Sequence, residues 1–179
     1  KAIKNTQSKY GADVMLTENK INAEILYNKY DIFKSVFSWY LYASFFLFIF
    51  LIIQIFYRKK IIDTLIKISI SAIYVLFVIH LIGLISRWYI SGHAPWSDGY
   101  ESMIYVAWAT MLFGLYFGRK SELTLASTTF VTSMILMIAH WSWMDPSIAN
   151  LVPVLDSYWL MIHVAVIVGS YGPFTISMI

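Results

Sequence analysis

Long apolar runs separated by short polar connections fill most of the chain, and this pattern predicts a bundle of membrane-spanning helices. A helix needs about 20 apolar residues to cross roughly 30 Å of hydrocarbon. Five runs approach that length, and they cover about residues 36–57, 66–89, 101–117, 121–143 and 157–179. We therefore expect an all-α integral membrane protein with about five transmembrane helices.

The first 36 residues differ from the rest, because they hold six of the ten lysines and four of the ten acidic residues. Thr17 is a candidate N-cap for a helix whose apolar positions, from Ile21 to Phe33, recur at roughly helical spacing. A helix on the membrane surface and a solvated linker both fit this segment. We expect a polar segment, 1–36, ahead of a transmembrane bundle, 37–179, in a piece of a longer protein.

Composition supports the membrane assignment and excludes several functions. Hydrophobic residues make up 59% of the chain and charged residues 13%, which is more apolar surface than a soluble domain can hide. The absence of cysteine excludes disulfides, thiolate metal sites and cysteine nucleophiles. The net charge of +3 comes from Lys and Arg beside apolar runs, so we expect no binding of nucleic acid.

Charges in the connections predict the orientation, since short cytoplasmic loops are enriched in Lys and Arg. The connections after the first and third runs carry Arg58, Lys59, Lys60, Arg119 and Lys120, whereas those after the second and fourth carry acids and no Lys or Arg. We expect the first set inside, and residues 1–36 outside despite their lysines. Near the ends of the second run, Lys67 and Arg87 are expected to snorkel.

Six of the seven tryptophans fall at or beyond the expected outer boundary, namely Trp39, Trp88, Trp96, Trp141, Trp143 and Trp159. Indole rings favour the headgroup zone, so an ordinary aromatic belt explains some of them. A belt populates both faces, however, and the one-sided set also fits an aromatic floor for a flat ligand such as a porphyrin. Met103 and Met161 are then either soft neighbours of that ligand or ordinary packing residues.

Three of the four histidines share this side. His163 lies about 9 Å below the start of the fifth run, where a ligand role and a structural role both fit. A solvated or interfacial place is expected for His93 and His140. For His80, in the middle of the second run, we expect a hydrogen bond between helices, with an internal metal or haem ligand as the alternative.

Other chemical signatures are absent from the sequence. It holds no HExxH, P-loop or GxGxxG motif and no paired acids inside a run, which argues against protease and nucleotide-binding functions. Proton or ion transport usually leaves acids or lysines deep in the bilayer, and the apolar runs hold none there.

Two segments resemble the cytochrome c biogenesis proteins of the CcsA or ResC type. The first is SGHAPWSDGYES, from Ser91 to Ser102, followed by an aromatic run. The second is PVLDSYWLMIHV, from Pro153 to Val164, followed by the triplet Ser170, Tyr171 and Gly172. The two segments also occur in the same order as in that family, and the resemblance covers residues 37–179.

The resemblance implies a function in cytochrome c maturation. Such proteins carry haem b to the outer face of the bacterial cytoplasmic membrane and join it to the CXXCH motif of apocytochrome c, as part of a holocytochrome c synthase. The resemblance implies that His163 is an axial ligand of the haem iron. Trp159 and Trp96, from the expected aromatic floor, and His93 are further candidate haem-binding residues.

The resemblance also implies partners. Residues 1–36 are similar to the join to a fused CcsB or ResB half, as in CcsBA proteins. The tryptophan-rich WWD segment and the second axial histidine are expected beyond residue 179, so this stretch alone is not expected to be active. The alternative is a non-haem transporter or scaffold, in which His163 and the tryptophans anchor helices.

Overall fold

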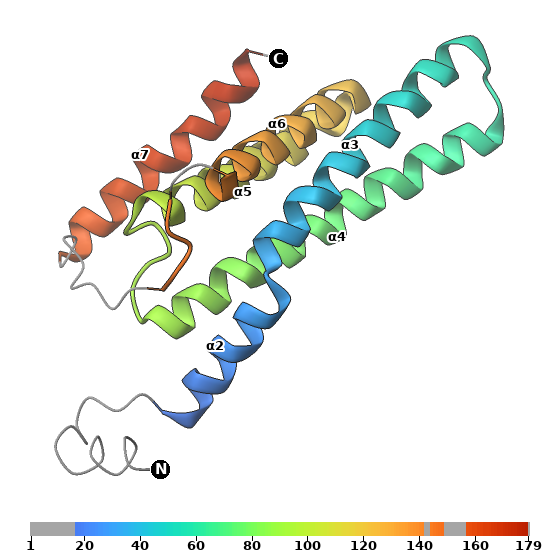
Figure 1. The fold of residues 1–179 in the computed structure, drawn as a ribbon. Helices are drawn as coiled ribbons and strands as arrows, with labels where there is room; N and C mark the ends of the chain where they lie inside the picture. The colour runs from blue at the N-terminus through green and yellow to red at the C-terminus, as the bar shows by residue number, and fades with distance from the viewer. Residues whose placement is uncertain (1–16, 142–143, 149–156, 179) are drawn as a thin grey trace, which may run out of the picture.

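The computed structural model describes residues 17–141, 144–148 and 157–178, and its regular structure over these residues is entirely helical. Figure 1 shows the elements in order: α2 (Glu18–Tyr30), α3 (Ile32–Phe56), α4 (Lys60–Ser91), α5 (Gly99–Phe117), the 3-10 turn η2 (Gly118–Lys120), α6 (Glu122–Trp141) and α7 (Tyr158–Ser177). The predicted all-α class is confirmed.

Four helical stretches in the described part are long and apolar enough to cross a membrane: Glu18–Phe56, Lys60–Ser91, Glu122–Trp141 and Tyr158–Ser177. Helix α5 has 19 residues, or about 28 Å, and it returns the chain from the end of α4 to the start of α6. Helices α3 to α7 thus correspond to the five apolar runs, and the protein is a multi-pass membrane protein.

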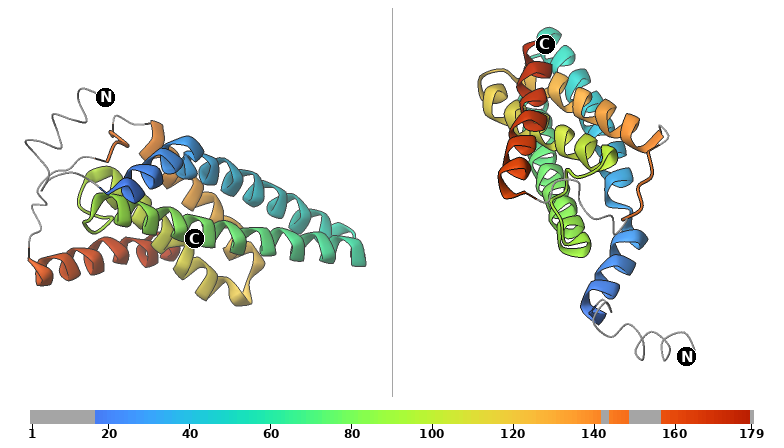
Figure 2. Two further views of the ribbon diagram at one scale, coloured as in Figure 1. Left: turned by 90° about the horizontal axis from the view of Figure 1, so that it is seen from below. Right: turned by 90° about the vertical axis from the view of Figure 1, so that its left-hand side faces the viewer.

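The helices run roughly along one direction (Figures 1 and 2). Helix α3 packs against α4 and α6, and α5 packs against α6 and α7. The α3–α4 and α5–α6 turns, which carry the basic groups, lie at one end of the bundle (Figure 1). The α4–α5 loop and the first turn of α7 lie at the other end. The connections rich in Lys and Arg therefore share one end of the fold, as the charge pattern of the sequence predicts.

Helix α2 continues α3 beyond the bundle. It begins after Thr17, whose side chain makes no capping hydrogen bond, and it ends at Asp31, which has a left-handed φ of 40°. Ile25 and Leu26 are exposed on α2, whereas Tyr27 packs against the core. The helix lies against α4, and through that contact it reaches the end of the bundle that carries the α4–α5 loop.

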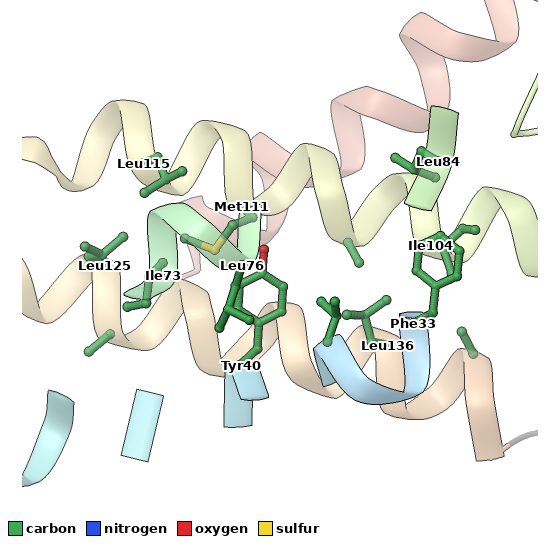
Figure 3. Close-up of a cluster of buried hydrophobic side chains, with 14 of the residues drawn as sticks. Phe33, Tyr40, Ile73, Leu76, Leu84, Ile104, Met111, Leu115, Leu125 and Leu136 are labelled. Atoms are coloured by element: carbon green, nitrogen blue, oxygen red, sulfur yellow. The ribbon is translucent and has the colours of Figure 1, made fainter. Parts of the chain in front are cut away.

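The core of the bundle is apolar and draws on four helices. Tyr40 of α3, Ile73 of α4, Met111 of α5 and Leu136 of α6 are buried in it (Figure 3). The hydroxyl residues of α6 also face inward, because Thr128 and Thr132 are fully buried and the Thr132 hydroxyl lies 3.8 Å from the Met111 sulfur. Both threonines thus pack between helices, as hydroxyl residues in membrane helices commonly do.

Helix α7 is held by its contact with α5 and is otherwise mostly uncovered in the described structure. Gly172 makes that contact close, since a Cβ there would lie 2.9 Å from the Thr110 nitrogen and 3.0 Å from the Ala109 carbonyl carbon. Small residues at helix crossings in membranes allow backbones to approach in this way. Gly172 therefore fixes how α7 is placed on the bundle.

Gly172→Ala is expected to destabilise the α5–α7 contact by about 1–3 kcal/mol, because the added methyl group meets backbone that cannot rotate away. Thermal unfolding of the full-length protein in detergent measures the loss. The matched control is Gly169→Ala on the same helix, where the new Cβ stands 3.4 Å or more from the Tyr105 ring. Equal melting temperatures for the two variants would contradict the close contact at Gly172.

Candidate functional site

The loop between α4 and α5 is built by two capping arrangements. Gly92 ends α4 with φ 78°, and its amide donates to the Trp88 carbonyl at 2.9 Å. Asp98 begins α5, and its side chain accepts a hydrogen bond from the Glu101 amide at 2.6 Å. Both caps are formed by residues close together in the sequence. The local sequence therefore reverses the direction of the chain, and the start of α5 faces the end of α4.

That turn brings Arg87 of α4 against Glu101 of α5. The Arg87 Nε donates to a Glu101 carboxylate oxygen at 2.8 Å, and the two side chains are 0% and 1% exposed. The guanidinium also donates to the carbonyls of Pro146 at 2.8 Å and Ser147 at 3.1 Å. The expected snorkelling of Arg87 is therefore wrong, because carbonyls and a carboxylate satisfy the charge inside the protein.

Further groups complete the surroundings of the Arg87 guanidinium. The guanidinium carbon, Cζ, stands 5.0 Å from the centre of the Tyr100 ring. Nη1 lies 3.4 Å from the Tyr27 hydroxyl of α2, and Nη2 lies 3.7 Å from an Asp98 carboxylate oxygen. The Ser147 amide donates to Asp145 at 2.9 Å, and this hydrogen bond lowers the pKa of the Asp145 carboxyl. One arginine thus joins α2, α4, α5 and the segment that follows α6.

Glu101 connects this network to His93. Its second carboxylate oxygen accepts from the Ser97 amide at 3.0 Å and lies 3.7 Å from His93 Nδ1. The same Nδ1 lies 3.2 Å from the Ala94 carbonyl oxygen. The His93 side chain is 14% exposed, so the expected solvated place is only partly correct.

Trp96, in the same loop, belongs to a row of aromatic rings that begins at Trp88. Its ring centre is 6.2 Å from that of Trp88 and 4.9 Å from that of Tyr105. Tyr105 stacks on Trp108, with 6.2 Å between ring centres, and Trp108 stacks on Phe77 at 5.5 Å. The row follows α4 and α5 from the loop into the bundle.

The other tryptophans do not join this row. Trp141 and Trp159 are 80% and 77% exposed. Trp39 lines a pocket with Val75 and Leu76, near the middle of α4, so it does not belong to an aromatic floor at the loop end. Trp143 lies outside the described residues.

His163 lies on the uncovered side of α7. The helix turns about 100° per residue, so His163 points away from the face on which Gly172 meets α5. Trp159 is one turn earlier on the same side, and Val166 is 66% exposed there. Within the described residues the His163 side chain makes no hydrogen bond or ion pair.

The structure therefore brings the candidate residues together in two pairs. His93 and Trp96 share the α4–α5 loop, and Trp159 and His163 share one face of α7, with no contact joining the pairs in the described part of the chain. The α4–α5 loop and the start of α7, which carry these pairs, lie toward the end of the bundle away from the basic turns (Figure 1).

The remaining histidines agree with their predicted places. His80 is fully buried, and its Nε2 lies 3.1 Å from the Ile104 carbonyl of α5, which confirms the hydrogen bond between helices. His140, near the end of α6, is exposed.

Sequence reasoning missed the Arg87–Glu101 pair. A usable signal was present, since Arg87 stands about one and a half turns before the helix-ending Gly92 and Glu101 stands in the first turn of the next helix. Opposite charges on both sides of a tight connection are placed to meet when that connection reverses the chain.

Comparisons with known proteins agree with this architecture. The family described as Cytochrome C assembly protein matches residues 96–179. Protein NrfI of Wolinella succinogenes is 40% identical over 169 residues, which cover 94% of this chain and 19% of NrfI. Proteins named cytochrome c biogenesis protein CcsA, from Lobularia maritima and Guizotia abyssinica, are 38% and 44% identical over 93 and 99 residues; each match covers 50% of this chain and 28% or 29% of the relative.

These findings define a class and then a family. The chain is a multi-pass helical membrane protein, and the CcsA relatives that it matches are named as cytochrome c biogenesis proteins. Residues 96–179 belong to the family of cytochrome c assembly proteins, and the chain is similar to the CcsA-type proteins. It spans about a fifth of the length of NrfI and under a third of the length of the CcsA relatives.

Proposed function

We propose that this chain is part of a cytochrome c synthase that carries haem b across the membrane and joins it to the CXXCH motif of apocytochrome c. The observation that carries the proposal is the exposed imidazole of His163, on an uncovered face of α7 next to Trp159 and toward the end of the bundle opposite the basic turns. Haem is here the substrate, and the family to which residues 96–179 belong supports this choice.

The chemistry of His163 fits one axial position of a haem iron. A neutral imidazole is a common iron ligand, and a ring nitrogen free of hydrogen bonds is available to bind iron. The neighbouring exposed side chains are apolar or aromatic, such as Trp159 and Val166, which suits a flat porphyrin in a water-poor setting. Among the candidate residues only His163 is assigned to the iron, so a second ligand must come from elsewhere in the full-length protein.

The other candidates take supporting roles. Trp159 is one turn before His163 and offers an indole face to the porphyrin. Trp96 and His93, in the α4–α5 loop, are proposed to contact haem from the bundle side, where the row of rings begins.

The proposed setting is the bacterial cytoplasmic membrane, with the haem-binding end outside. The basic turns then lie in the cytoplasm, as short loops rich in Lys and Arg usually do. Residues 1–36 form an extracytoplasmic segment that leads from a CcsB or ResB half, fused or associated, and residues 37–179 form the bundle. A WWD segment would follow α7 and complete the site.

The pigment of the purified full-length protein tests this function. A haem-handling protein should show a Soret band that sharpens and shifts on reduction, and cells that express it with an apocytochrome c should accumulate cytochrome with covalently bound haem. A colourless full-length preparation that yields no covalent haem would instead favour a scaffold or transporter.

A further inference from the structure

The surroundings of His93 fix which of its ring nitrogens carries the proton. Both groups near Nδ1 are acceptors, namely the Ala94 carbonyl at 3.2 Å and the Glu101 carboxylate at 3.7 Å. A neutral imidazole carries one N–H group, and at Nδ1 this group points toward two acceptors. The lone pair then lies on Nε2, which makes no hydrogen bond within the described residues.

Glu101 is itself held so that it cannot turn away. Arg87 binds one of its carboxylate oxygens at 2.8 Å and the Ser97 amide binds the other at 3.0 Å. Both charged side chains are almost completely buried. An imidazole whose inner nitrogen faces a fixed carboxylate, with its outer nitrogen free, is the arrangement by which proteins orient a base.

We propose that His93 is the proton-transfer residue of thioether formation, with Glu101 and Arg87 as its positioning residues. This inference rests on the proposed function. In the reaction the C–S bond forms at one carbon of a haem vinyl group while the vinyl π bond breaks. Nε2 of His93 takes the proton from the cysteine thiol and returns it to the other vinyl carbon, so the addition is balanced without an oxidant or a reductant.

The location of His93 agrees with that role. The loop that carries it also carries Trp96 of the aromatic row, and this loop lies toward the same end of the bundle as the start of α7 (Figure 1). The imidazole is 14% exposed, so it is reachable and still partly shielded from water. General acid or base catalysis of this kind typically contributes 10²–10⁴-fold in rate.

Charged groups around His93 come from three helices. Glu101 and Asp98 belong to the start of α5, and Arg87 belongs to α4 and pairs with both. From α2, the Lys20 ammonium approaches the neighbouring Gly92, since a Cβ there would lie 3.6 Å from it. Glu101 is the acidic group nearest to His93, so substitution of Glu101 should change the tautomer of the His93 ring most.

The state of the ring can be tested without any activity. Full-length protein labelled with ¹⁵N at histidine reports the tautomer of His93 by NMR, with the signal assigned by its loss in His93→Gln. We expect the Nδ1–H tautomer, and we expect Glu101→Gln to shift the ring toward Nε2–H, because the new amide presents an N–H to Nδ1. Glu122→Gln, an exposed acid at the other end of the bundle, is the control. An Nε2–H tautomer in the unmodified protein would overturn the proposal.

The chemical role is tested by the rate of haem attachment in isolated membranes, measured per haem-loaded protein. His93→Gln should keep most of the Soret band, because His163 and not His93 is assigned to the iron, and should slow attachment about 100-fold. Glu101→Gln should slow it about tenfold and displace its pH profile, whereas His140→Gln should match the unmodified protein. An unchanged rate in His93→Gln, or loss of its haem, overturns the proposal. If the unmodified protein itself binds haem but forms no thioether, the proposed function fails instead, and this inference falls with it.

Discussion

His163→Ala in the full-length protein is expected to weaken the outer haem site and reduce holocytochrome c to near background. The side chain makes no contact that holds the fold together, since it faces away from α5 and forms no hydrogen bond in the described structure. Its loss should therefore remove an iron ligand while leaving the bundle folded. Absorption spectra of the purified protein and haem staining of the cytochrome measure the two effects.

Two controls separate ligation from damage. Added imidazole should partly restore both the spectrum and the cytochrome, because it can enter the space that the alanine leaves and bind the iron. His140→Ala removes another exposed histidine near the same end of the bundle and should change neither. Unaltered haem spectra together with unaltered cytochrome output in His163→Ala would eliminate His163 as the ligand.

Arg87→Met is expected to have the largest effect on stability. The change leaves the Glu101 carboxylate buried without its counter-charge and leaves the carbonyls of Pro146 and Ser147 without donors. Removing one partner of a buried ion pair typically costs about 3–5 kcal/mol. Thermal unfolding of the full-length protein in detergent should show this as a large drop in melting temperature.

The matched control is Lys67→Met on the same helix, because Lys67 is exposed and the change should be nearly silent. The double variant Arg87→Met with Glu101→Met should recover part of the loss, since it removes the unpaired charge. Equal stability of Arg87→Met and Lys67→Met would mean that the buried pair does not hold the loop end of the bundle together.

Much of the architecture follows from the sequence, because a helix that crosses lipid must be long and apolar. A run such as 36–57 has no charge and enough length to cross the membrane, so its helix was predictable from composition alone. Thr128 and Thr132 stand four residues apart, and this spacing puts both on the side of α6 that the structure buries. Interfacial placement of exposed His140 and burial of His80 followed from position within a run.

The errors concern the direction and depth of single side chains. Arg87 stands near a helix end, where snorkelling is the usual outcome, but its burial depends on partners from α5 and from the segment after α6. Trp39 was expected at the outer boundary, yet the chain continues through α2 beyond the start of α3, and the ring lines a pocket with residues from the middle of α4. Such contacts depend on tertiary packing, which periodicity along one run does not encode.

The side on which α7 begins tests the account most directly. The chain has no cysteine, so Tyr158→Cys in an otherwise cysteine-free full-length protein gives a single reporter beside the exposed start of α7. Lys120→Cys, in the turn at the opposite end, is the paired control. In intact cells a membrane-impermeant maleimide should label position 158 and leave position 120 unlabelled until the membrane is opened. Labelling of position 120 alone would place His163 toward the cytoplasm and contradict delivery of haem to the outer face.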